Sequence, residues 1–132
     1  HYFFGFADIT GRQNIHDVSA RLSLAPRVDL QLRFDFHRFW LASSRDALYS
    51  TGSGASYHVP DGSAGTDIGS EIDLSARWDI TSRASMLLGY SYFWSGEFFD
   101  SPIVQGGPAG LAGNSSNGRD ASFLYLQSTI RF

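Results

Sequence analysis

Charged side chains recur at every second position in several segments of this 132-residue chain, between apolar neighbours. Arg33 and Asp35 do so in the segment 28–37, and Asp73 and Arg77 do so in the segment 71–80. Successive side chains of a β-strand point to opposite faces, so a period of two places the charges of each segment on one face. The set predicted for this face contains Asp17, Asp29, Asp35, Glu71, Asp73, Asp79, Arg21, Arg33, Arg77 and Arg131.

Two interpretations of this charged face remain open. In channels, arginines and carboxylates that face one another steer charged solutes. With six acids and four bases, this face would form a slightly negative wall of a lumen. On that interpretation, the residues that line a lumen and contact solute are Arg21, Arg33, Asp35, Asp73, Arg77 and Arg131. Alternatively, the same charges form cross-strand ion pairs that only stabilise a wet interior.

The sequence carries no signature of covalent chemistry. It has no GxSxG, HExxH or P-loop pattern, and a strand would point the neighbours His16 and Asp17 to opposite faces. The absence of cysteine excludes disulfides and thiolate metal sites. A net charge of −3 argues against a nucleic-acid partner. We therefore expect no enzymatic activity, no cofactor and no metal site.

The alternation defines the elements that position these charges. It is clear in the segments 17–24, 28–37, 71–80 and 124–132, and the segments 1–9 and 85–95 are further strand candidates. Strands of roughly 9–12 residues exceed the usual length in globular proteins and suit a tilted crossing of a bilayer. We expect an all-β fold, with residues 1–132 forming one segment of an antiparallel transmembrane β-barrel of about six strands.

The connections between these strands alternate in length. Short turns are predicted at 25–27 and 81–83, a short connection at 10–14, and long Gly- and Ser-rich loops at about 41–67 and 96–120. Outer-membrane barrels have short periplasmic turns and long extracellular loops. The two long loops are therefore predicted to be extracellular.

Aromatic residues make up 15% of the chain, and many of them lie near predicted strand ends. Such positions are typical of the girdles that barrels place at both membrane interfaces. A buried sandwich core is the alternative. The predicted girdle comprises Phe39, Trp40, Trp78, Tyr90, Tyr92 and Trp94.

Several strings resemble one known family. The strings at 37–42 (HRFWLA), 69–74 (GSEIDL) and 88–93 (LGYSYF), together with Asn14 to Asp17, resemble the C-terminal part of alginate-export-type outer-membrane proteins. The last ten residues, 123–132, resemble the closing strand of bacterial barrels, in which a terminal phenylalanine, here Phe132, is a signal for the barrel assembly machinery.

The resemblance implies a porin-like channel in the outer membrane of a Gram-negative bacterium that exports an anionic, polysaccharide-like solute. Family members have an arginine-rich constriction, and Arg21, Arg33, Arg77 and Arg131 occupy matching inward positions here. The implied partners are the lipid bilayer with its lipopolysaccharide and the barrel assembly machinery.

Six strands are too few to close a membrane barrel, which needs at least about eight. Three accounts of closure remain open. The chain is a fragment of a longer barrel, several copies close one barrel together, or it is a soluble sheet whose apolar face is covered by partners. The alternative function is a structural or interaction module that pairs edge to edge with partner chains.

Overall fold

The computed structural model describes residues 11–49, 56–57, 61–100 and 120–132. Long antiparallel strands dominate it: β1 (Ile15–Arg27), β2 (Leu30–Leu41), β5 (Asp67–Thr81), β6 (Ala84–Ser95) and β7 (Ala121–Ile130). A short hairpin, β3 (Leu48–Tyr49) with β4 (Ser56–Tyr57), lies between β2 and β5, and one helical turn, α1 (Glu97–Asp100), follows β6. The predicted all-β antiparallel class is confirmed.

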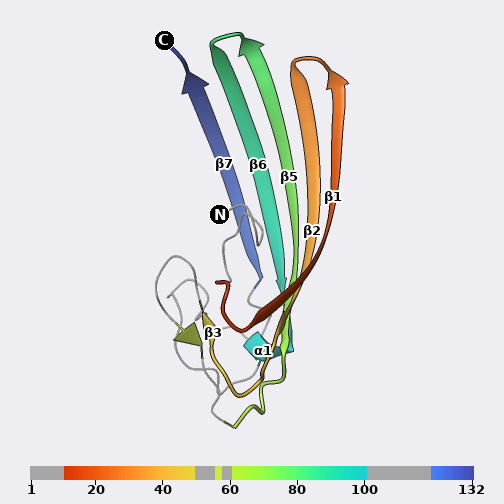
Figure 1. Ribbon diagram of the computed structural model, residues 1–132, viewed down its shortest axis with the longest axis vertical. Helices are drawn as coiled ribbons and strands as arrows, with labels where there is room; N and C mark the ends of the chain where they lie inside the picture. The colour runs from red at the N-terminus through yellow and green to blue at the C-terminus, as the bar shows by residue number, and fades with distance from the viewer. Residues whose placement is uncertain (1–10, 50–55, 58–60, 101–119) are drawn as a thin grey trace.

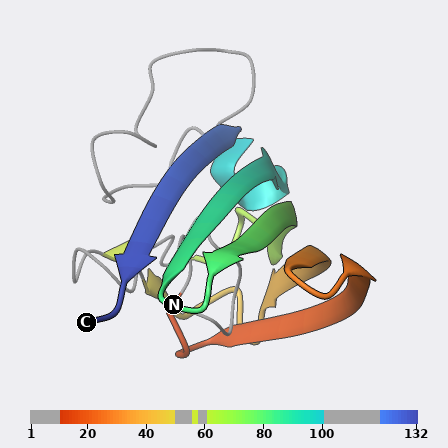
Figure 2. The same ribbon diagram turned by 90° about the horizontal axis from the view of Figure 1, so that it is seen from above.

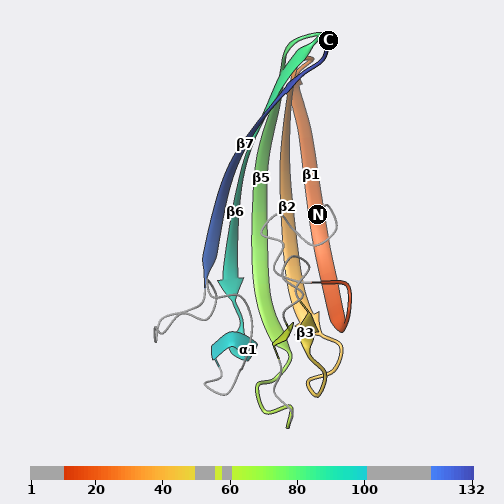
Figure 3. The ribbon, with the colours of Figure 1, turned by 90° about the vertical axis from the view of Figure 1, so that its left-hand side faces the viewer.

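The five long strands form one sheet in the order β1-β2-β5-β6-β7 (Figure 1). The sheet curves across its width, as seen from above in Figure 2, and β1 and β7 are its two outer strands. The tight turns β1–β2 and β5–β6 and the C-terminus lie at one end, and the β3–β4 hairpin and α1 lie at the other (Figure 3). Among the described residues, no helix has the length and apolar character needed to cross a membrane.

One face of this sheet is apolar and exposed. Leu22, Leu74, Leu88, Leu124 and Leu126 are each 46–69% exposed, although burial of such side chains normally drives folding. The pairing register places large apolar residues from all five strands side by side on this face. A continuous exposed apolar face of this extent fits contact with lipid.

The sequence pattern misplaced one turn. The short turn expected at 25–27 lies at Val28–Asp29 instead, because β1 continues to Arg27. Its register shifts between Leu24 and Arg27, where Pro26 falls. Proline cannot donate to the ladder but is tolerated at such an irregularity, so it interrupts the pairing without ending the strand. The turn at 81–83 agrees with the structure, and the strand expected at 1–9 lies outside the described residues.

The buried core lies at the long-loop end, on the polar side of the sheet. Phe39 and Phe93 extend from β2 and β6 into a cluster that also contains residues of the loops, of α1 and of the ends of β2 and β5. The remaining buried members of this loop cluster are Leu41, Leu48, Tyr57, Ala64, Ile68, Phe98 and Phe99. The long loops thus fold against the polar face of the sheet.

Gly69 allows the sheet to meet the loop cluster. Its φ of 134° lies in a region that residues with a side chain rarely adopt. A Cβ at this position would lie 2.1 Å from the carbonyl oxygen of Trp94. The register between β2 and β5 shifts next to Gly69, between Phe39 and Trp40. Glycine is therefore required where β5 bends into the loops.

Candidate functional site

The charged residues singled out by the sequence lie on the polar face of the sheet. Asp35 of β2 pairs with Arg21 of β1 on one side and with Asp73 of β5 on the other. Arg33 of β2 pairs with Ser75 of β5, and Arg77 lies two residues further along β5. Because side chains two residues apart share a face, this register brings five of the six predicted lumen residues together on the polar face.

Acids dominate the half of this face nearest the long loops, and they are buried. Asp35, Glu71 and Asp73 are 2%, 0% and 1% exposed. Asp17 Oδ2 lies 2.9 Å from Nδ1 of His37, which stacks on Phe39 at 5.5 Å between ring centroids. These carboxylates are therefore withdrawn from solvent.

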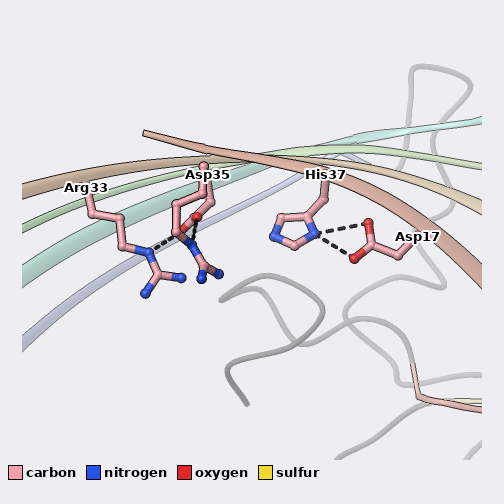
Figure 4. A network of polar contacts seen from close by, with 5 residues as sticks. Asp17, Arg33, Asp35 and His37 are labelled. Atoms are coloured by element: carbon pink, nitrogen blue, oxygen red, sulfur yellow. Dashed lines mark hydrogen bonds and ion pairs between the residues drawn. The ribbon is translucent and has the colours of Figure 1, made fainter. Parts of the chain in front are cut away.

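Asp17, Asp35 and Asp73 each have a polar neighbour. Asp35 accepts hydrogen bonds from Nε of Arg21, at 2.5 Å, and from Nε of Arg33. Asp73 accepts one from the hydroxyl of Ser91 on β6. Figure 4 shows Arg33, Asp35, His37 and Asp17 projecting from one side of the sheet. A buried carboxylate is costly unless it is paired, and these contacts offset that cost.

Arginines dominate the half of the face nearest the tight turns, and they border open space. A hollow of about 190 Å³ at the β5–β6 turn is lined by Arg77, Asp79, Arg83 and Arg131, among other polar residues. A second hollow of about 270 Å³ is lined by residues that include Arg33, Arg77 and Gln127. Asp79 forms an ion pair with Arg77, Nε to Oδ1 at 3.1 Å, so arginine is in excess around both hollows.

Arg131 and Arg21 sit at different heights on this face. Arg131 follows β7 and borders the hollow at the turn, where its backbone N–H donates to the carbonyl of Arg83 at 2.9 Å. Arg21 lies in the row of Asp35 and Asp73, and its side chain is 52% exposed. Phe132, the predicted assembly signal, is fully exposed beyond the end of β7.

Most of the predicted girdle aromatics lie on the apolar face, at two levels. Trp78 of β5 pairs with Leu30 of β2 near the tight turns. Trp40 lies ten residues after Leu30 on β2, at the other level. Ten residues span about 33 Å of strand, or about 25 Å of height at a tilt of about 40°, close to the apolar band of outer-membrane barrels. Tyr92 and Trp94 lie near the Trp40 level, with their ring centroids 4.8 Å apart.

Two predicted girdle residues lie elsewhere. Phe39 is 1% exposed in the loop cluster, because its neighbour Trp40 takes the apolar face and Phe39 therefore takes the polar one. Tyr90 lies on the apolar face but pairs with Leu74 and Leu124, in the middle of the strands rather than at an end.

Asp29, in the turn between β1 and β2, holds Trp78 in position. Its carboxylate accepts hydrogen bonds from two other side chains. Nε1 of Trp78 donates to its carboxylate at 3.2 Å, and Arg27 donates twice, at 2.8 and 2.9 Å. Partial desolvation raises the pKa of this carboxyl, but hydrogen bonds from Trp78, the backbone and Arg27 outweigh it, so the pKa is lowered overall. The carboxylate stays charged and holds the indole in place at neutral pH.

Sequence reasoning missed two features of the polar face. One is the aromatic pair Phe123 and Tyr125, whose rings stack on the polar side of β7. The other is the burial of Asp35, Glu71 and Asp73. Within the described residues, no three histidine, aspartate or glutamate side chains gather as a metal site would require.

A curved antiparallel sheet of long strands, with a lipid-type apolar face, a charged opposite face and aromatics at two levels, defines the class of transmembrane β-barrel proteins. The comparison with protein families agrees, because the family described as alginate export matches residues 1–103. The chain belongs to the alginate export family.

That family consists of outer-membrane transport proteins of Gram-negative bacteria rather than enzymes, and its general role is the export of polysaccharide. Searches of curated proteins and of solved structures gave no match.

Proposed function

We propose that the polar face of this sheet lines the path of an acidic polysaccharide through the outer membrane. Arg33 and Arg77 are the main solute contacts, and Arg21 and Arg131 contribute at either side of them. In this arrangement the chain performs no covalent chemistry. Its residues attract the solute, exclude lipid from the path and keep the path hydrated.

The separation of charge along the strands is the observation that carries this proposal. Three of the six acids predicted for the polar face, Asp35, Glu71 and Asp73, are buried, and Asp79 of the turn half is paired with Arg77. The arginines of the turn half border the two polar hollows. A passing solute therefore meets more guanidinium groups than carboxylates, although the acids of the face outnumber its bases. Guanidinium groups suit this task because they bind carboxylates through paired hydrogen bonds.

The arginines should set the ion selectivity of the path. Replacing Arg77 or Arg33 with glutamine is expected to lower the ratio of anion to cation permeability about twofold. This follows from the loss of one unit charge about 8 Å from a passing ion, worth ~0.5 kcal/mol in water without salt and about half of that with a Debye length of ~10 Å, with opposite sign for anions and cations. Reversal potentials measured in planar bilayers with the complete assembly test this expectation.

Arg38 provides a matched control for that experiment. It also lies on β2, but on the opposite face, where it donates to Asp67 at 2.6 Å and lies over Trp40 at 5.6 Å. Arg38→Gln should leave the selectivity unchanged. Equal selectivity of the Arg33 and Arg77 variants and the unmodified protein would remove both residues from the solute path.

Barrel closure requires further strands beside β1 and β7. Backbone groups left unpaired in lipid cost several kcal/mol each, so open sheet edges do not occur in a bilayer. We propose that the remaining strands of a larger barrel, or further copies of this chain, pair with these two edges. The same proposal places the long loops outside the cell, facing lipopolysaccharide, and the tight turns in the periplasm.

Fractionation separates this proposal from the rival structural module. The chain is expected in the outer-membrane fraction and should need detergent to stay in solution, because its apolar face requires lipid. The measurement is the distribution of the chain after density-gradient separation of membranes, followed by extraction with salt and with detergent. Recovery as a monomer in detergent-free buffer would favour an edge-to-edge interaction module instead.

A further inference from the structure

We propose that Phe123 and Tyr125 form a stacking platform for a sugar ring on the polar face of the sheet. An acidic sugar residue would then be held through its ring by this platform and through its carboxylate by Arg33 and Arg77. This inference rests on the proposed function and adds a subsite for one residue of the polysaccharide.

The platform consists of two adjacent aromatic rings. The rings of Phe123 and Tyr125 are stacked, with centroids 5.8 Å apart and planes inclined by 25°. Both residues belong to the same face of β7 as Gln127, which lines the second hollow. Phe123 is 48% exposed on a face that is otherwise polar at this height. An exposed aromatic ring in a wet lumen is not needed for lipid contact.

Gly89 of β6 holds the tyrosine in position. A Cβ at Gly89 would lie 2.0–2.2 Å from the outer ring atoms and hydroxyl of Tyr125, so the ring covers this glycine. Tyr125 thus leans from β7 across β6, toward the arginines. An aromatic ring that covers a cross-strand glycine in this way also supports the sheet.

The register places the platform opposite a guanidinium group. Arg33, Ser75, Gly89 and Tyr125 form one row across β2, β5, β6 and β7. The tyrosine ring lies over β6, so about two strand spacings, roughly 10 Å, separate it from the backbone of Arg33. Only the small side chain of Ser75 rises between them. The hollow of about 270 Å³ lies beside this row.

This combination of groups suits an acidic sugar. The C–H groups on one face of a pyranose ring form an apolar patch that packs on an aromatic ring, and polar groups around the ring need hydrogen-bond partners. Arg33, Arg77 and Gln127 supply those partners, and the two guanidinium groups match a carboxylate. A simple inorganic anion would use the arginines but not the aromatic pair.

The test uses the assembly as it exists in detergent and a tetrasaccharide of uronic acid as the probe, with binding measured by calorimetry. Phe123→Leu keeps an apolar side chain but removes the aromatic face, and it is expected to weaken binding about fivefold. Phe123→Tyr keeps the face and should bind within about twofold of the unmodified protein. Conductance in sodium chloride should be unchanged in both variants, because small ions do not stack.

The outcomes distinguish this inference from the proposed function. If Arg77→Gln weakens tetrasaccharide binding but Phe123→Leu does not, the solute path stands and the platform is overturned. If Phe123→Leu changes the sodium chloride conductance as much as the binding, the residue has a structural role only, and the platform is also overturned. If the unmodified assembly fails to bind the tetrasaccharide, the proposed function itself fails.

Discussion

Replacing Leu88 with arginine is expected to destabilise the membrane-inserted protein by about 1–3 kcal/mol, between the cost at the bilayer midplane and the cost near an interface. Leu88 lies on the apolar face of β6 between the Trp78 level and the middle of the strands, is 50% exposed, and pairs with Ala76 and Leu126. On our assignment of the faces, its side chain contacts acyl chains. A guanidinium group there loses its hydration without gaining a partner. The measurement is the free energy of unfolding by denaturant in phospholipid vesicles.

Leu87 provides the control for this prediction, because the same substitution falls on the other face. Leu87 lines the second polar hollow, beside Gln127 and Arg77. Leu87→Arg should cost under about 1 kcal/mol, since the new charge stays hydrated and only weak repulsion from Arg77 opposes it. Equal costs for the two leucine variants would contradict the assignment of one face to lipid and the other to water.

Replacing Phe99 with alanine is expected to destabilise the protein by about 3–5 kcal/mol. Phe99 is 1% exposed, and its ring makes edge-to-face contacts with Tyr57, Phe93 and Phe98 at centroid distances of 5.6, 6.1 and 5.5 Å. Loss of the phenyl ring would leave a cavity where α1, the β3–β4 hairpin and β6 meet. Urea unfolding followed by tryptophan fluorescence measures the cost.

Limited proteolysis gives a local measurement of the same change. The loop between β2 and β5 should be cleaved faster in Phe99→Ala, because the loop cluster holds it against the sheet. Phe99→Leu preserves most of the buried volume and should cost under about 1.5 kcal/mol. If Phe99→Ala unfolds within about 0.5 kcal/mol of the unmodified protein, the range typical of surface substitutions, the loop cluster does not stabilise the fold.

The burial of acids also bears on the charge of the solute path. Counted from the sequence, the polar face has more acids than bases, which argues against an anionic solute. In the structure, Asp35 accepts hydrogen bonds from two arginines and Asp73 accepts one from Ser91, and both carboxylates are buried. The charges that border open space are mainly arginines. Accessibility, rather than the net count of charges, therefore supports the proposal of an acidic solute.

Local pattern was sufficient to predict the five long strands that the structure describes, with their faces. In segments such as 28–37 and 71–80 the alternation has a period of two, and a strand can satisfy it in one way only, with every second side chain toward lipid. Loop boundaries were also accessible, because glycine- and serine-rich stretches separate the alternating segments. The turn at Val28–Asp29 was misplaced, since Pro26 gives the same local signal in a turn and in an irregular strand.

The sequence by itself determined that this chain forms long amphipathic strands with a charged face, because that information lies between neighbouring residues. Only the tertiary structure decided which charges stay accessible, that Phe39 joins the loop cluster while Trp40 faces the opposite side, and that Tyr125 covers Gly89 in the row of Arg33. Each of these outcomes depends on strand register and on loops packing against residues distant in the sequence. No local period encodes such contacts, because they arise only when the whole sheet is assembled.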